Sequence, residues 1–351
     1  MSDKLGKIDH RIFEDVIQPK CGHWRNEVRS GPRFGVDVSV IDLPGGMAMA
    51  AASDPLSLVP SLGLEESAWL SVHLIANDMA TTGFAPMYGQ FVLNLPASFS
   101  RDDFKTYWNY IHKFCADIGV AITGGHTGFI EGQNSTIAGG GTFFTIAPGS
   151  QILIASNASP GDIILATKNC AISSASILAM SFPETVKNKL GQEVFHKACG
   201  MFYETSSLDD ALTAVGKQAR HNDITAMHDV TEGGVLGAIY ELASASGNGA
   251  VVYSDQLPVS RVAGAVCSLF SIDQRYCVGA GSMIIACKKD KAGLITERLN
   301  KEDIPCCVVG EIKEKESGIR LMENGRMDDL IYPEEDPYWA AFFNASRKGW
   351  R

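Results

Sequence analysis

Four aspartates stand at positions where aspartate is a poor structural choice: Asp37, Asp54, Asp78 and Asp229. Three of them interrupt or end apolar runs that we expect to be strands, and Asp78 flanks the apolar stripe of an expected helix. A carboxylate at the margin of a core is costly unless something compensates it. Because Mg²⁺ binds through carboxylates together with substrate phosphates, we predict that these aspartates hold magnesium. Each alone also fits an ordinary cap, turn or surface charge, and Ser53-Asp54-Pro55 is typical of a turn.

Two glycine-rich segments follow expected strands, Gly124-Gly125-His126-Thr127-Gly128 and Thr231-Glu232-Gly233-Gly234. Exposed backbone N–H groups at such turns suit phosphate oxygens, so both segments are predicted to bind a nucleotide. A tight turn that needs positive φ would explain each one equally well. Neither segment matches the Walker P-loop or the Gly-x-Gly-x-x-Gly pattern.

Two histidines and one lysine are further candidates for the chemistry. His126 and His228 lie beside the two turns, and such a pair suggests a metal ligand or a general base. Hydrogen-bonded structural histidines are the alternative. Lys7, after Gly6, is a candidate charge partner for phosphate, although a solvated lysine near the N-terminus is the simpler interpretation.

The elements expected to position these residues in the first half are strands and two helices. Strands are predicted over 35–43 and 47–52, joined by a hairpin turn at Gly45-Gly46, and over 88–95, 120–123 and 136–146. A helix over 65–82 has the stripe Ala68, Val72, Ile75 and Met79, with Asn77 opposite it. Ser100 and Asp103 form a capping box for a second helix, with the stripe Phe104, Trp108, Ile111, Cys115 and Ile118.

The second half alternates helices and strands after a turn-rich stretch at residues 156–162. Strands are expected over 163–167, 224–227, 283–286 and 307–309, and helices over 171–180, 208–220 and 291–299, with another after Gly234. This pattern predicts a mixed α+β or α/β fold. We divide the chain into an N-terminal domain at 1–155, a C-terminal α/β domain at 156–335 and a C-terminal helix or tail at 336–351.

Composition restricts the class of protein. The 351 residues carry a net charge of −10, and no basic patch of the kind used by nucleic-acid-binding proteins is visible. No segment is long and apolar enough for a membrane span, and the first residues do not resemble a secretory signal. The nine cysteines form no Cys-x-x-Cys pair and are expected to be reduced thiols in the cytoplasm rather than zinc ligands.

Taken together and in order, these motifs resemble the PurM-like superfamily, also called the AIR-synthase-related superfamily. The most specific segments are Asn77-Asp78-Met79-Ala80 and His228-Asp229-Val230-Thr231-Glu232-Gly233-Gly234, and the resemblance runs from about Lys7 to Glu311. It is strongest to HypE-like proteins, which act in hydrogenase maturation, and extends to selenophosphate synthetase and thiamine-monophosphate kinase. It implies a two-domain fold whose N-terminal sheets pair into a dimer barrel.

The resemblance also implies the chemistry. ATP would lie near Asn77 and the two glycine-rich segments, with magnesium on Asp37, Asp54, Asp78 and Asp229, and with Lys7 and His126 as catalytic residues. Such an enzyme transfers the γ-phosphate of ATP to an oxygen of a small molecule or a protein terminus. One alternative is a non-catalytic nucleotide-binding or assembly protein. It is favoured by His126, which replaces the aspartate of HypE, and by the absence of cysteine from Ser346 to Arg351. Another alternative is a metal-dependent phosphohydrolase that uses His228 and Asp229.

Overall fold

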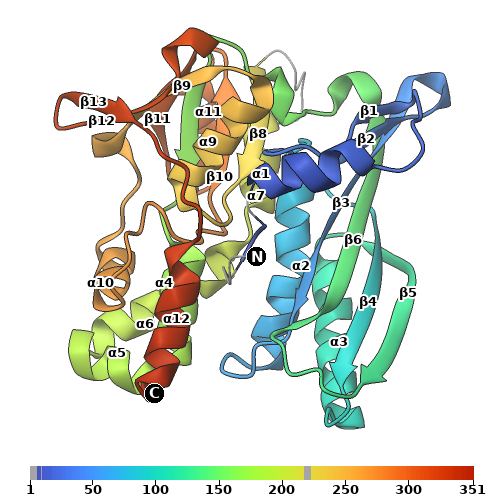
Figure 1. Ribbon diagram of the computed structural model, residues 1–351, viewed down its shortest axis with the longest axis vertical. Coiled ribbons are helices and arrows are strands. Elements are labelled where there is room, and N and C mark those ends of the chain that lie inside the picture. Colours follow the sequence, from blue (N-terminus) through green and yellow to red (C-terminus); the bar gives the residue numbers. More distant parts are fainter. Residues whose placement is uncertain (1–5, 9, 217–222) are drawn as a thin grey trace.

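The computed structural model describes residues 6–8, 10–216 and 223–351, and within them two mixed sheets are flanked by helices (Figure 1). The first sheet has the strand order β1-β2-β3-β6-β4-β5. Its strands are β1 Val28–Ser30, β2 Ser39–Asp42, β3 Met47–Ser57, β4 Tyr88–Pro96, β5 Ala121–Ile130 and β6 Ile137–Pro148. Only β4 and β5 pair in parallel within this sheet.

The second sheet has the order β13-β12-β9-β11-β7-β10-β8. Its strands are β7 Ile163–Thr167, β8 Ile224–Asp229, β9 Gly249–Tyr253, β10 Met283–Cys287, β11 Cys306–Lys313, β12 Ile319–Glu323 and β13 Arg326–Asp329. Its pairings are antiparallel except that between β12 and β9. Two separate, mostly antiparallel sheets confirm the predicted mixed α+β fold class.

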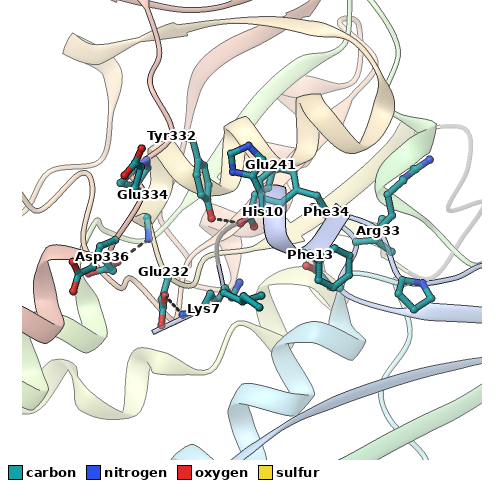
Figure 2. A pocket seen from close by; sticks show the side chains of 18 residues that line it. Lys7, His10, Phe13, Arg33, Phe34, Glu232, Glu241, Tyr332, Glu334 and Asp336 are labelled. Carbon is teal, nitrogen blue, oxygen red and sulfur yellow. Dashed lines mark hydrogen bonds between the residues drawn. The ribbon is translucent and has the colours of Figure 1, made fainter. Parts of the chain in front are cut away.

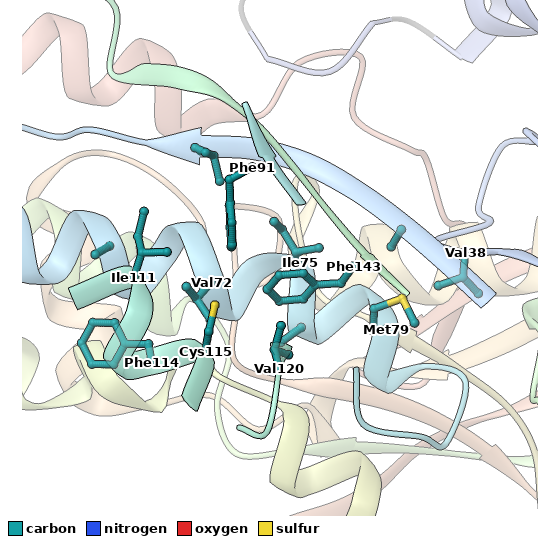
Figure 3. Close-up of a cluster of buried hydrophobic side chains, with 14 of the residues drawn as sticks. Val38, Val72, Ile75, Met79, Phe91, Ile111, Phe114, Cys115, Val120 and Phe143 are labelled. Carbon is teal, nitrogen blue, oxygen red and sulfur yellow. The ribbon is translucent and has the colours of Figure 1, made fainter. Parts of the chain in front are cut away.

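Two long helices, α2 Leu64–Ala80 and α3 Arg101–Asp117, cover one face of the first sheet (Figure 1). The stripe predicted for α2 is confirmed, since its four members are fully buried. They meet Phe91 of β4 and Phe143 of β6 in one apolar core (Figure 3). Ser100 caps α3 as predicted, because its hydroxyl accepts from the Asp103 N–H at 3.0 Å. The buried face of α3 is instead centred on Tyr107, Ile111, Phe114 and Cys115.

The second half contributes most of the remaining helices. They are α4 Ile172–Ser181, α5 Pro183–Leu190, α6 Gln192–Gly200, α7 Leu208–Val215, α9 Gly234–Ser246, α10 Arg261–Leu269, α11 Ala292–Lys301 and α12 Pro337–Arg347. The short α1, His10–Ile12, precedes the first sheet. Helices α4, α5, α6, α10 and α12 gather into a helical lobe below the second sheet in Figure 1. Residues 217–220, which end the helix predicted over 208–220, lie outside the described residues.

Two predicted strand boundaries are wrong, and both bear on candidate site residues. Strand β2 begins at Ser39, so Asp37 precedes the strand instead of interrupting it. Strand β3 continues through Ser53-Asp54-Pro55 to Ser57, because β6 supplies partners across the whole stretch. Asp54 therefore lies inside a strand, where tertiary pairing overrides a local turn signal.

The predicted turn at Gly124–Gly128 is also wrong, because these residues belong to β5. Gly125 has a φ of +139°, and a Cβ atom there would meet the Phe91 carbonyl oxygen at 1.8 Å. The glycine is thus required for close backbone pairing between β5 and β4.

None of the helices in the described ranges combines the length and apolarity needed to cross a bilayer. All nine cysteines are free thiols in the structure.

Candidate active site at the junction of the two sheets

The four predicted aspartates converge where the two halves of the chain meet. Asp37 comes just before β2, Asp54 lies in β3, Asp78 lies in the last turn of α2, and Asp229 ends β8 of the second sheet. Burial, together with the charges of Asp229, Asp54 and Asp37, raises the pKa of Asp78 well above its ordinary value. Residues nearly two hundred positions apart in sequence therefore share one electrostatic environment.

His228 lies among these carboxylates and is 1% exposed. Its Nε2 atom is 3.3 Å from Asp37 Oδ1 and 3.2 Å from Glu241 Oε2, and its Nδ1 atom lies 2.7 Å from the Asp229 carbonyl oxygen. Burial lowers the pKa of His228, but Asp37, Glu241 and Asp229 outweigh it and raise the pKa to about 10. In this arrangement the neighbouring carboxylates favour the cationic form of His228.

Two carboxylate oxygens in this cluster are buried without a hydrogen-bond partner, Asp37 Oδ2 and Asp229 Oδ1. Burial also raises the pKa of Asp54 to about 6 and that of Asp229 to about 7. Unsatisfied buried carboxylates are unfavourable, and a hard divalent cation with a preference for oxygen ligands would satisfy them. The donor set therefore fits magnesium. One ligand atom each from Asp37, His228 and Asp229 lies within 4.8 Å of the others.

Lys7 of the N-terminal segment lies beside Glu232 (Figure 2), and its charge lowers the pKa of all four aspartates. Its Nζ donates to Thr231 Oγ1 at 2.8 Å, and its backbone N–H donates to Glu232 Oε2 at 2.8 Å. Burial lowers the pKa of Lys7, but the negative charges of Glu241, Asp229 and Asp37 raise it by more, so the net shift is upward. The ammonium group stays charged beside the aspartates, where it can balance an anionic ligand.

The turn that holds Lys7 is fixed by the C-terminal helix. Asp336, the N-cap of α12, accepts the Gly233 N–H at 2.7 Å, and Trp339 Nε1 donates to Glu232 Oε1 at 2.9 Å. The Gly234 N–H donates to the Thr231 carbonyl oxygen at 3.2 Å. The N–H groups of Gly233 and Gly234 are therefore engaged within the protein, so this turn positions Lys7 and Glu232 instead of offering those two N–H groups to phosphate.

Gly35 allows the first half of the chain to approach α9 closely. Its φ is +74°, and a Cβ atom there would meet the Glu241 carbonyl oxygen at 2.3 Å. This contact sets Asp37, two residues later, beside His228 and Glu241.

Several predicted site residues do not join the cluster within one chain. Gly124, Gly125, His126 and Thr127 lie on β5, an exposed edge strand separated from β3 by β6 and β4. Asn77 is fully buried, and its amide donates to the Thr205 carbonyl oxygen at 2.9 Å and accepts the Ser207 N–H at 2.7 Å. Its side chain thus docks α2 onto the second half of the chain.

Sequence reasoning missed Glu241, Tyr332, Asp336 and Trp339. Glu241 is the sole charged residue of α9, whose sequence is otherwise small and apolar, and this signal indicated a buried carboxylate. Tyr332 donates to Glu241 Oε1 at 2.5 Å. The three C-terminal residues contact partners about one hundred positions earlier, which no local pattern reveals.

Most of the chain matches two models of one protein family. Residues 35–146 match the family model for the N-terminal domain of AIR synthase related proteins, and residues 159–322 match the model for the C-terminal domain. The chain belongs to the AIR synthase related family. Each of its two family domains contributes to the aspartate cluster, whereas Lys7 and α12 lie outside both matches.

Relatives of this AIR synthase related chain include enzymes. It is 25% identical to carbamoyl dehydratase HypE of Cupriavidus necator over 73% of this chain and 70% of that protein. It is 20% identical to thiamine-monophosphate kinase of Buchnera aphidicola over 90% of this chain and 95% of that protein. A crystal structure of hydrogenase maturation protein HypE in complex with ATP has a TM-score of 0.68 at 20% identity, covering 94% of this chain and 96% of that one.

Proposed function

We propose that this protein is an ATP- and magnesium-dependent enzyme that transfers the γ-phosphate of ATP to an oxygen of an acceptor. The convergence of Asp37, Asp54, Asp78 and Asp229 from both halves of the chain carries the proposal. Two buried carboxylate oxygens without hydrogen-bond partners, Asp37 Oδ2 and Asp229 Oδ1, support a cation at this cluster. The relationship to a dehydratase and a kinase, and the ATP complex of HypE, support nucleotide chemistry in this protein.

The four aspartates would hold magnesium, which when bound neutralises triphosphate charge and stabilises charge on the transferring group. Lys7 is placed to balance the remaining phosphate charge, since Thr231 and Glu232 fix both its ammonium and its backbone N–H group. His228 and Glu241 orient Asp37 and exclude water behind it, because both are buried. These residues act by positioning and by charge, which is how phosphoryl transfer is generally catalysed.

We further propose that the protein is a homodimer formed through the first sheet. Helices α2 and α3 cover one face of that sheet, and the uncovered face and its edge carry exposed apolar side chains, namely Val92, Phe129 and Ile146 at 42%, 51% and 41% exposure. Strand β5 is an edge strand with one side unpaired. Exposed apolar surface of this kind marks an association site.

The function is tested by incubating the protein with ATP and measuring ADP in the presence of Mg²⁺ or EDTA. We expect slow ADP formation with Mg²⁺, none with EDTA, and none for Asp229→Asn. Tight binding of ATP without ADP formation, with every acceptor tried, would instead indicate a nucleotide-binding assembly protein. Cleavage of p-nitrophenyl phosphate without ATP would indicate a phosphohydrolase.

A further inference from the structure

A cavity of about 410 Å³ opens beside the aspartate cluster (Figure 2). Its walls come from three segments far apart in sequence: the N-terminal segment around α1, residues 32–37, and residues 332–336 that lead into α12. The first and the last of these segments lie outside both family-model matches. The volume lies within the range of small-molecule sites, about 300–1,000 Å³. Because Asp37 lines the cavity, a molecule inside it would reach the centre where the γ-phosphate is proposed to react.

The charged side chains at the inner end of the cavity are engaged within the protein. Asp37 Oδ1 and Glu241 Oε2 lie 3.3 and 3.2 Å from His228 Nε2. Lys7 Nζ donates to Thr231 Oγ1, and its charge is balanced by the neighbouring carboxylates. In the proposed function, Asp37 and Lys7 are further engaged by magnesium and phosphate. A charged group of the acceptor would lose its hydration here without meeting a free opposite charge, which is unfavourable.

The charged side chains at the outer end of the cavity are exposed to solvent. Glu334 lies 3.6 Å from Arg11, and the two side chains are 65% and 64% exposed. Glu335 also has an interaction partner, and the exposed Arg33 donates to the Ala245 carbonyl oxygen at 2.6 Å. Ion pairs between exposed groups contribute little, because water screens them. Neither end of the cavity therefore selects a ligand by its charge.

The middle of the cavity is aromatic. The ring centroids of His10 and Phe34 are 5.3 Å apart, as are those of Phe34 and Tyr332. The Tyr332 hydroxyl is turned toward Glu241 at the inner end, so its ring remains as wall (Figure 2). Phe13 lines the same cavity. Aromatic side chains cover flat rings through stacked or edge-to-face contacts, and the burial of apolar area adds to the affinity.

We propose that this cavity is the acceptor site and that the acceptor is an uncharged molecule with a flat ring and a hydroxyl group. This inference rests on the proposed function. The ring would lie against Phe34 and Tyr332, and the hydroxyl oxygen toward Asp37. In the transfer, the hydroxyl oxygen forms a bond to the γ-phosphorus, the bond from the γ-phosphorus to the β,γ-bridging oxygen breaks, ADP leaves, and the hydroxyl proton passes to solvent.

The test uses probes that differ in charge or in the shape of the ring. Indole-3-ethanol, tryptamine and indole-3-propionate carry the same ring and the same two-carbon spacer, ending in a hydroxyl, an ammonium or a carboxylate. Each is titrated calorimetrically into the full-length protein with Mg²⁺ and a non-hydrolysable ATP analogue. We expect indole-3-ethanol to bind near one per chain and at least about tenfold more tightly than either charged probe, which corresponds to about 1.4 kcal/mol. 2-Cyclohexylethanol, which has the same hydroxyethyl group on a ring that is not flat, should bind several-fold more weakly.

Three variants locate the binding. Phe34→Leu and Phe13→Leu should each weaken indole-3-ethanol several-fold, because each removes an aromatic ring from the wall. Phe343→Leu, at an exposed ring on α12 that does not line the cavity, should leave the affinity unchanged. Phe13 lies in a short helical turn without buried residues, so its variant keeps the test open if Phe34→Leu does not fold.

A charged probe that binds as tightly as indole-3-ethanol, 2-cyclohexylethanol that binds equally well, or binding of no probe would overturn the proposal. So would displacement of indole-3-ethanol by adenosine, which would make the cavity a nucleoside site. The proposed function has a separate readout, because binding of the ATP analogue is measured before any probe is added. Binding of indole-3-ethanol to a protein that does not bind the analogue would refute the ATP function and leave a site for uncharged flat rings.

Discussion

Replacing Asp78 by Asn removes one charge from the aspartate cluster and keeps the size of the side chain. The carboxylate is partly buried near the end of α2, and its pKa is raised by burial and by the charges of Asp229, Asp54 and Asp37. In the absence of a divalent cation these charges repel one another. The amide should therefore stabilise the metal-free protein and weaken its binding of MgATP.

The magnitude follows from Coulomb's law. Two carboxylates about 5 Å apart repel by roughly 3 kcal/mol at an effective dielectric constant of about 20. The Lys7 ammonium offsets part of this repulsion, so we expect a net gain of about 1–2 kcal/mol. A gain of 1 kcal/mol raises the Tm by about 2–4 °C in domains of 150–250 residues. Losing an anionic ligand should weaken MgATP binding at least tenfold, or about 1.4 kcal/mol.

Scanning calorimetry without metal and titration with MgATP measure the two effects on the same protein. Asp209→Asn is the matched control, because Asp209 is exposed on α7 and should change neither quantity appreciably. An Asp78→Asn protein that binds MgATP as tightly as the parent would refute the reasoning. So would a loss of stability without metal, which would show that Asp78 supports the fold as a charge.

Three further predictions concern pH, the C-terminal helix and the dimer. The raised pKa values of Asp54 and Asp229 make the folded protein bind more protons than the unfolded chain between about pH 3.8 and pH 7. The contribution of these two residues to stability therefore falls as pH rises through that window. Mg²⁺ should consequently raise the Tm more at pH 8 than at pH 5. Trp339→Phe keeps a ring but removes the N–H donor to Glu232, and ATP affinity should fall about fivefold, or about 1 kcal/mol, with the Tm little changed. Ile146→Asp places a charge on the uncovered sheet face, and light scattering should report a shift from dimer to monomer.

Each of these has a contrary result, and the two substitutions have matched controls. A Tm gain from Mg²⁺ that is the same at both pH values would contradict the charge account. Trp350→Phe, where the ring packs on Phe270 far from the turn, should leave ATP affinity unchanged, and equal losses in both variants would remove the special role of Trp339. Ile331→Asp, at a side chain that is 74% exposed, controls for the added charge, and a monomeric parent protein would refute the dimer.

Sequence reasoning succeeded where the structure depends on local periodicity. The stripe of α2 and the Ser100 cap are set by spacing within one helix, so α2 was predicted to within two residues at each end and α3 was predicted to begin after Ser100. Helices α5, α6 and α10 were not predicted. The central strands of both sheets were predicted from short apolar runs. The family resemblance came from motifs, and it is confirmed by matches to both domain models.

Prediction from the sequence failed where partners distant in sequence decide the conformation. Asp54 lies in a strand because β6 pairs with it, and Gly124 and Gly125 lie in a strand because they pair with β4. Neither partner is visible in the local sequence. The roles of Asp336 and Trp339 depend on contacts more than one hundred residues away. The domain boundary at 155/156 stays a prediction, although it falls between the last strand of the first sheet and β7.

The most direct test of the aspartate cluster is a calorimetric titration of the protein with ATP, with and without Mg²⁺. We predict binding of about one ATP per chain that depends on Mg²⁺ and is lost in Asp229→Asn. ATP that binds equally well without Mg²⁺, or does not bind in either condition, would contradict the claim that these carboxylates form a magnesium-nucleotide site.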